Sequence, residues 1–154
     1  MKVLYAIQGT GNGHLSRAQE IVPLLNKYVD TTVLVSGNQS QIQSNFDINY
    51  RKTGLTFLSG KNGKIDLIRT VFKSHPIDFF NEIRTFQIKQ FDLVITDFEP
   101  VSAWSALMHG VPCVEMSHQA AVNHPNAPKT ETRNRIGEYI LNHYCPTKEK
   151  IGFH

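Results

Sequence analysis

The sequence has few of the features that mark secreted, membrane-spanning or metal-stabilised proteins. It contains two cysteines in 154 residues, Cys113 and Cys145, with no Cys-x-x-Cys pair, which excludes a disulfide framework and a zinc ribbon. Its first apolar run, residues 3–7, is too short for a signal peptide or a membrane span. The formal charge of +3 is too small to indicate nucleic-acid binding. We therefore expect one cytoplasmic domain over residues 1–154.

What the chain does have is an alternation of short β-rich runs with longer helical stretches. The strands that we expect are residues 3–7, 31–35, 91–96 and 112–116, with one or two weaker ones within 48–58. The expected helices are residues 15–25, 39–46, 101–109 and 133–144, and a stretch over 64–91 that Pro76 divides. Residues 118–132 read as a polar loop, and residues 148–154 look like the approach to another strand. This order predicts an α/β fold: a Rossmann-like, open and mainly parallel sheet with helices on both faces.

A glycine-rich loop follows the first expected strand, where open α/β sheets bind their ligands. It consists of Gly9, Thr10, Gly11, Asn12 and Gly13. Its glycines let backbone N–H groups approach an anion at a helix N-terminus, although glycines also serve tight turns. The spacing is not that of a dinucleotide fingerprint, the second strand ends without the required acid, and no Gly-Lys-Ser/Thr follows. NAD and ATP are therefore poor fits, and we expect no cofactor.

His14 and Arg17 come directly after this loop, at the start of the expected helix. A histidine can accept a proton from an alcohol near neutral pH when a second group fixes its tautomer. The alternative is a capping or solvated histidine. Arg17, one turn further on, either faces the same ligand or is solvated.

Two acids follow the third confident strand, again at the carboxyl edge. Asp97 and Glu99 precede Pro100, which opens a helix, so each can cap free N–H groups. The functional alternative is a carboxylate that orients His14 or binds a substrate hydroxyl. No third ligand is evident, and we expect no metal.

Two further segments are candidates for contact with a ligand or a membrane. His118 and Gln119 follow the fourth strand at the same edge, where they can contact a ligand or satisfy loop backbone. The helical stretch over 64–91 mixes apolar residues with lysine and arginine. One interpretation is that its apolar residues belong to the core and its charged residues face water. The other is that they form a patch that binds a membrane surface or a lipid-linked substrate.

The motif Gly-x-Gly-x-Gly-His-x-x-Arg over residues 9–17 resembles the N-terminal domain of GT-B glycosyltransferases. Residues 97–100 and 106–114 resemble the later strand–helix–strand segment of the MurG-like branch, which includes a family of uncharacterised bacterial and archaeal transferases. Residues 117–122, Ser-His-Gln-Ala-Ala-Val, look like a shifted form of that branch's His-Glu-Gln-Asn-Ala-Val. Because the positions of its His, Glu and Asn differ here, only Gln119 carries over.

The resemblance implies the acceptor-binding half of an inverting, metal-independent glycosyltransferase. His14 would be the catalytic base, paired with Asp97, and a nucleotide-sugar donor would bind mainly to a C-terminal domain absent from this chain. The acceptor would be a sugar or a lipid-linked sugar, and the enzyme would be cytoplasmic, with peripheral contact to the inner face of the membrane. The alternatives are a non-catalytic, partner-binding or membrane-anchoring half of a split transferase and, third, a nucleotide-binding oxidoreductase domain.

Overall fold

The computed structural model describes residues 1–10, 12–37, 43–55, 76–122, 124, 126–127, 139 and 142–153. Its strands are β1 (Lys2–Gln8), β2 (Asp30–Ser36), β3 (Tyr50–Lys52), β4 (Leu93–Asp97), β5 (Cys113–Ser117) and β6 (Glu149–Gly152). Its helices are α1 (Asn12–Leu25), α3 (Pro76–Thr85), α4 (Pro100–His109) and α5 (His118–Val122), with a 3₁₀ turn, η1 (Ile88–Gln90).

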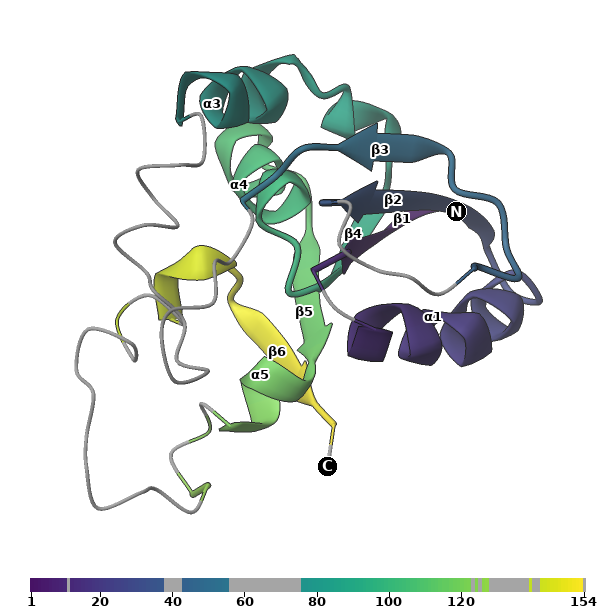
Figure 1. Cartoon of the computed structure of the whole chain (residues 1–154). Helices are drawn as coiled ribbons and strands as arrows, with labels where there is room; N and C mark the ends of the chain where they lie inside the picture. The colour runs from purple at the N-terminus through teal and green to yellow at the C-terminus, as the bar shows by residue number, and fades with distance from the viewer. Residues whose placement is uncertain are drawn as a thin grey trace.

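The six strands form one sheet in the order β3-β2-β1-β4-β5-β6, and every neighbouring pair is parallel. The chain builds outward from β1 to β3 and then returns to the other side of β1 with β4 (Figure 1). The topological switch point therefore lies between β1 and β4, where α/β sheets of this order leave a crevice at their carboxyl ends. The predicted Rossmann-like α/β fold is confirmed.

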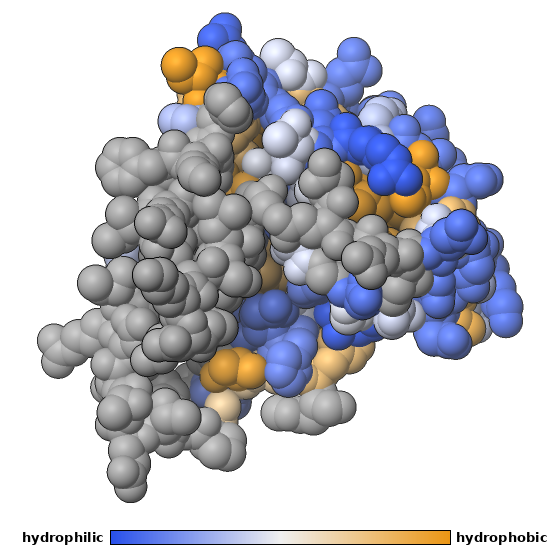
Figure 2. All heavy atoms as spheres, in the orientation of Figure 1, coloured by the Kyte–Doolittle hydropathy of each residue, from blue (hydrophilic) through white to orange (hydrophobic). Residues whose placement is uncertain are grey.

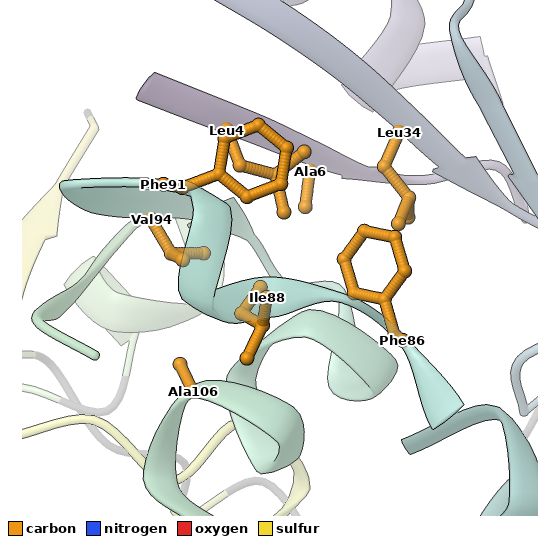
Figure 3. Packing of buried hydrophobic residues seen from close by; sticks show 8 residues of the cluster. All are labelled: Leu4, Ala6, Leu34, Phe86, Ile88, Phe91, Val94 and Ala106. Carbon is orange, nitrogen blue, oxygen red and sulfur yellow. The ribbon is translucent and has the colours of Figure 1, made fainter. Parts of the chain in front are cut away.

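Helices cover both faces of the sheet, because the central strands are apolar on both sides. In β1 the side chains of Leu4 and Ala6 point to the layer of α4 and η1 (Figure 3), whereas Tyr5 and Ile7 point to α1. Successive residues of a strand face opposite sides of the sheet, so a continuous apolar run produces a strand that is buried on both faces. Figure 1 shows α1 on one side of the sheet and α3 and α4 together on the other.

Helix α4 shows how local sequence fixes an element at the sheet edge. Glu99 is its N-cap, since its carboxylate accepts hydrogen bonds from the backbone N–H of Val101 at 2.9 Å and of Ser102 at 2.7 Å. Pro100 opens the helix, and Gly110 ends it in the left-handed conformation with φ 71°.

Some of the predictions differ from the structure or fall partly outside the residues that it describes. Residues 118–122 form helix α5 instead of a loop, because the Ser117 hydroxyl accepts the Ala120 N–H at 3.0 Å and so caps a run with helix-forming alanines. Residues 43–46 are not helical, although a helix was expected over 39–46. The expected approach to a strand within 148–154 is itself strand β6. The structure does not describe residues 38–42, 56–75 and 128–138. The rest of the expected helix over 39–46, the first part of the 64–91 stretch and most of the last expected helix fall in these ranges.

Candidate active site

Three side chains from two distant parts of the sequence meet at the switch point. His14 is in the first turn of α1, Arg17 is one turn further along, and Asp97 is the last residue of β4. Because β1 and β4 pair in parallel, with Ile7 opposite Asp97, the end of β4 lies beside the loop that leads into α1. The fold thus brings together three residues that the sequence analysis singled out.

His14 contacts Asp97 directly. Its Nδ1 lies 2.9 Å from Oδ1 of Asp97, a carboxylate that is completely buried, while 13% of the His14 side chain is exposed. Between Nδ1 and this carboxylate a proton on the ring nitrogen makes a hydrogen bond, whereas an unprotonated Nδ1 would set two lone pairs against each other. The geometry therefore favours Nδ1–H donating to Asp97 and an unprotonated Nε2, which can accept a proton from a ligand.

Arg17 binds the same carboxylate. Its Nε donates to Oδ2 at 3.0 Å, and its Nη2 lies 2.8 Å from both carboxylate oxygens and 3.2 Å from Nδ1 of His14. The sequence left two alternatives for Arg17, ligand contact and solvation, and the structure adds an ion pair with Asp97 that neither of them includes. The guanidinium compensates a buried negative charge, which would be costly if left alone.

Tyr5 lies beneath this ion pair as the largest completely buried side chain of β1. Burial raises the pKa of Tyr5 well above its usual value, and the Asp97 carboxylate raises it further, while Arg17 acts in the opposite direction. Its hydroxyl has no hydrogen-bond partner among the described residues. Tyr5 is therefore a buried, neutral phenol close enough to the ion pair for both of its charges to act on the pKa.

The two ends of the glycine loop differ in the space around them: Gly9 is closely packed, whereas Gly13 borders open space. A Cβ on Gly9 would lie 2.8 Å from the Ser36 carbonyl oxygen, and the Gly9 N–H donates to that oxygen. Gly9 is thus required where β1 and β2 end side by side. A Cβ on Gly13 would meet nothing within 4 Å, so the helix start beside His14 faces open space. Thr10 accepts a hydrogen bond from Nε2 of Gln8 at 3.0 Å, and Gly11 lies outside the described residues.

Glu99 does not join this cluster. Both of its oxygens accept helix N–H groups of α4, its side chain is completely buried, and burial raises the pKa of Glu99 above its usual value despite those hydrogen bonds. The capping alternative describes its place in the structure.

His118 and Gln119 lie at the same sheet edge, in α5 after β5. His118 is exposed, and its Nδ1 lies 3.3 Å from the carbonyl oxygen of Phe153. Gln119 has a buried Oε1 with no hydrogen-bond partner among the described residues. Among the residues that the structure describes, no hydrogen bond joins His118 or Gln119 to His14.

The sequence analysis missed the contribution of β6. Lys150 places its Nζ 2.9 Å from Oε2 of the buried Glu115, whose other oxygen accepts the Ser117 hydroxyl at 2.6 Å. Phe153, just after β6, lies under the guanidinium of Arg17, with 5.0 Å between Cζ and the ring centroid. The only signal for these contacts was the strand-like ending, because strand pairing between distant segments leaves no local pattern.

The described residues also contain a hollow of about 510 Å³ away from this cluster. It lies between the end of α4 and the starts of β5 and β6, where Leu107, Pro112 and Thr147 are among its lining residues. It therefore opens at the amino edge of the sheet, opposite the switch point. No group of three His, Cys, Asp or Glu side chains suited to a metal ion occurs in the described ranges.

Comparisons with known proteins agree with this architecture. The family model described as glycosyl transferase family 1 matches residues 1–149. The crystal structure of Acinetobacter baumannii MurG is similar, with a TM-score of 0.51 at 15% sequence identity, over 98% of this chain and 45% of that chain. The chain thus spans less than half the length of that protein. Among curated proteins, none matches the sequence.

The ion pair predicts a large and specific stability effect. Arg17→Met leaves the Asp97 carboxylate buried without compensation, and the expected loss is about 3–5 kcal/mol in the free energy of unfolding, measured by urea denaturation. Adding Asp97→Asn to Arg17→Met is expected to recover part of that loss, because the buried charge is then removed.

The matched control is Arg84→Met, since Arg84 is an exposed arginine on α3. We expect it to change the free energy of unfolding by no more than about 0.5 kcal/mol. An Arg17→Met loss as small as that of the control would contradict the role given to the ion pair.

Proposed function

The chain belongs to glycosyl transferase family 1, and we propose that it forms the acceptor side of an inverting glycosyltransferase. The reaction moves a sugar from a nucleotide-sugar donor to a hydroxyl group of the acceptor. The observation that carries the proposal is the contact of His14 with Asp97 at the switch point, which leaves one ring nitrogen free to act as a base. Family membership also makes the oxidoreductase alternative unnecessary.

In this proposal Nε2 of His14 removes the acceptor hydroxyl proton as the oxygen attacks the anomeric carbon. The new carbon–oxygen bond forms on the face opposite the leaving group, and the bond to the donor phosphate breaks with its electron pair passing to the nucleoside diphosphate. A single displacement of this kind inverts the anomeric configuration. General-base assistance contributes about 10²–10⁴-fold to the rate.

Asp97 acts as a positioning residue rather than as a proton acceptor. Its Oδ1 accepts the Nδ1–H of His14, which orients the ring and stabilises the imidazolium that forms when Nε2 is protonated. Arg17 fixes this carboxylate by binding both of its oxygens.

The start of α1 supplies a place for the phosphate groups of the substrate. Four N–H groups at a helix start lack partners within the helix, and the helix dipole favours negative charge there. The open space at Gly13 lets a phosphate approach this backbone. We assign the loop of residues 9–13 to this contact and propose His118 and Gln119, at the neighbouring strand end, as acceptor-sugar contacts. A helix N-terminus can take over the charge compensation that a divalent cation would supply, which fits a metal-independent reaction.

We propose that the donor binds mainly in a part of the enzyme outside this chain. The 45% coverage of the MurG structure leaves room for a second domain of similar size. In such a two-domain enzyme the cleft closes on both substrates, so this chain alone should show no turnover. The alternative function, a non-catalytic partner-binding half, would use the same fold without needing His14.

The role of His14 predicts a large kinetic effect. His14→Gln in the complete enzyme keeps an N–H for Asp97 but has no basic nitrogen. We expect turnover to fall about 10²–10⁴-fold with the melting temperature little changed. The measurement is release of nucleoside diphosphate from UDP- and GDP-sugars, with free and polyprenyl-phosphate-linked sugars as acceptors.

His109→Gln is the control, because His109 belongs to α4 and contacts the Ser105 carbonyl. It should leave turnover unchanged. Near-normal turnover in His14→Gln would assign His14 to structure and favour the non-catalytic alternative.

The two glycines of the loop predict opposite results for the same substitution. Gly9→Ala should destabilise the fold, since its Cβ would lie 2.8 Å from the Ser36 carbonyl oxygen. Gly13→Ala should leave stability unchanged or raise it by about 0.5–1 kcal/mol, because alanine is the better helix former. Gly13→Ala should nevertheless lower kcat/KM, since its methyl group occupies the space assigned to phosphate. Unchanged kinetics in Gly13→Ala would mean that the loop is no more than a turn.

Peripheral membrane contact is a second part of the proposal, carried by α3 and α4. These helices pack side by side, and both expose apolar side chains: Ile77, Phe80, Trp104, Leu107 and Met108. Figure 2 shows apolar atoms next to hydrophilic ones over α3. The described helices include none long and apolar enough to cross a membrane. Such a surface suits a lipid-linked acceptor, whose sugar would have to reach the switch point.

Vesicle flotation tests this contact. The chain should float with vesicles that contain an anionic lipid, and Ile77→Ser with Phe80→Ser should reduce the bound fraction several-fold without changing the melting temperature. Tyr28→Ser is the control, because Tyr28 is 84% exposed and follows α1, the helix on the other side of the sheet. Equal flotation of both variants would exclude α3 as the contact surface.

A further inference from the structure

The end of β6 is held firmly at the carboxyl edge of the sheet. Gly152 packs so closely on α5 that an added Cβ would lie 2.6 Å from the Cα of Ala121. The next residue, Phe153, donates its backbone N–H to the Ser117 carbonyl at 3.3 Å, and its own carbonyl lies 3.3 Å from Nδ1 of His118. Two backbone contacts and a tight strand–helix approach therefore decide where the Phe153 ring can lie.

The ring lies against the guanidinium of Arg17, with Cζ 5.0 Å from the ring centroid. The N–H groups of a guanidinium lie in its plane, so the hydrogen bonds to Asp97 use its edge and leave its faces for an aromatic ring. A cation over an aromatic face is attracted to it. The Arg17 side chain, which is 22% exposed, is thus held by a carboxylate and by a ring from separate parts of the chain.

These contacts form a continuous series from β6 to the base. Phe153 contacts Arg17, Arg17 binds both oxygens of Asp97, and Asp97 contacts Nδ1 of His14. If the Arg17 side chain moved away, the Asp97 carboxylate would no longer be held in its present orientation. Arg17 makes three of the four contacts between this cluster and Asp97. Phe153 also lies beyond residues 1–149, the segment that matches the family.

We propose that Phe153 is a positioning residue that acts through Arg17 and Asp97 on the His14 base. The proposal rests on the role proposed for His14, and it adds that the end of β6 sets the orientation of the imidazole. The chemistry of the ring matters more than its bulk, because the contact is one of a cation with an aromatic face.

NMR of the whole chain tests this without any substrate. One readout is the rate at which the Nε–H of Arg17 exchanges with water, and the other is the pair of ¹⁵N signals of the His14 ring. Phe153→Leu should accelerate that exchange about threefold to thirtyfold and shift the His14 ring signals. Phe153→Tyr should restore both, because it keeps the aromatic face. Ile151→Ala, which removes an exposed apolar side chain from the same strand, should leave both unchanged.

A second variant separates the electrostatic contact from packing. Pentafluorophenylalanine at position 153 keeps the shape of the ring but reverses the charge distribution of its face, so it should accelerate exchange as Phe153→Leu does. It serves in place of Phe153→Leu if that variant does not fold. Exchange within twofold of the unsubstituted chain in both variants, or an equal change in Ile151→Ala, would overturn the proposal. Loss of turnover plays no part in these readouts, so the proposal can fail while the function proposed for His14 holds, and the reverse.

Discussion

The buried charge of Asp97 is the constraint around which the carboxyl edge of the sheet is arranged. The last residue of a central strand has neighbours on both sides and helices above and below, so its side chain has no access to water. A carboxylate in that position needs donors that are already in place. Helix α1 supplies them, since Arg17 and His14 are one turn apart on the face turned toward β4. The loop between β1 and α1 must therefore be short and tight, which explains why Gly9 has no room for a side chain.

The same constraint joins stability to the proposed chemistry. Arg17 places a permanent positive charge beside the Asp97 carboxylate, so that charge does not have to come from His14. His14 then contributes the hydrogen bond from its Nδ1–H. The arginine thus keeps Nε2 of His14 available for a proton, although it touches no reacting atom in the proposed mechanism.

Much of the fold could be predicted from the sequence, and only part of the site. The strand over residues 3–7, the glycine loop and the strand that leads to Asp97 are encoded by local apolar runs and turn residues. The position of the loop and of Asp97 at the sheet edge then followed from topology. The resemblance implied a contact between Asp97 and His14, and the structure contains that contact. The position of Arg17 could not be predicted, since a basic residue on the first turns of a helix is equally compatible with a ligand and with water. Phe153 was missed because β6 pairs with β5 across more than thirty residues, and such pairing leaves no local pattern.

The low sequence identity to the MurG structure follows from the same division between topology and chemistry. Parallel pairing of β1 with β4 brings the start of α1 and the end of β4 together whatever the other residues are, so the fold tolerates wide divergence. Chemistry requires specific side chains only at the few positions that this pairing places side by side. At the neighbouring strand end Ser117 caps α5 and donates to the buried Glu115, whereas His118 is exposed and lies outside the Asp97 cluster. In the proposed function, residues that distinguish one acceptor sugar from another should therefore be sought at the start of α5 rather than at His14, Arg17 or Asp97.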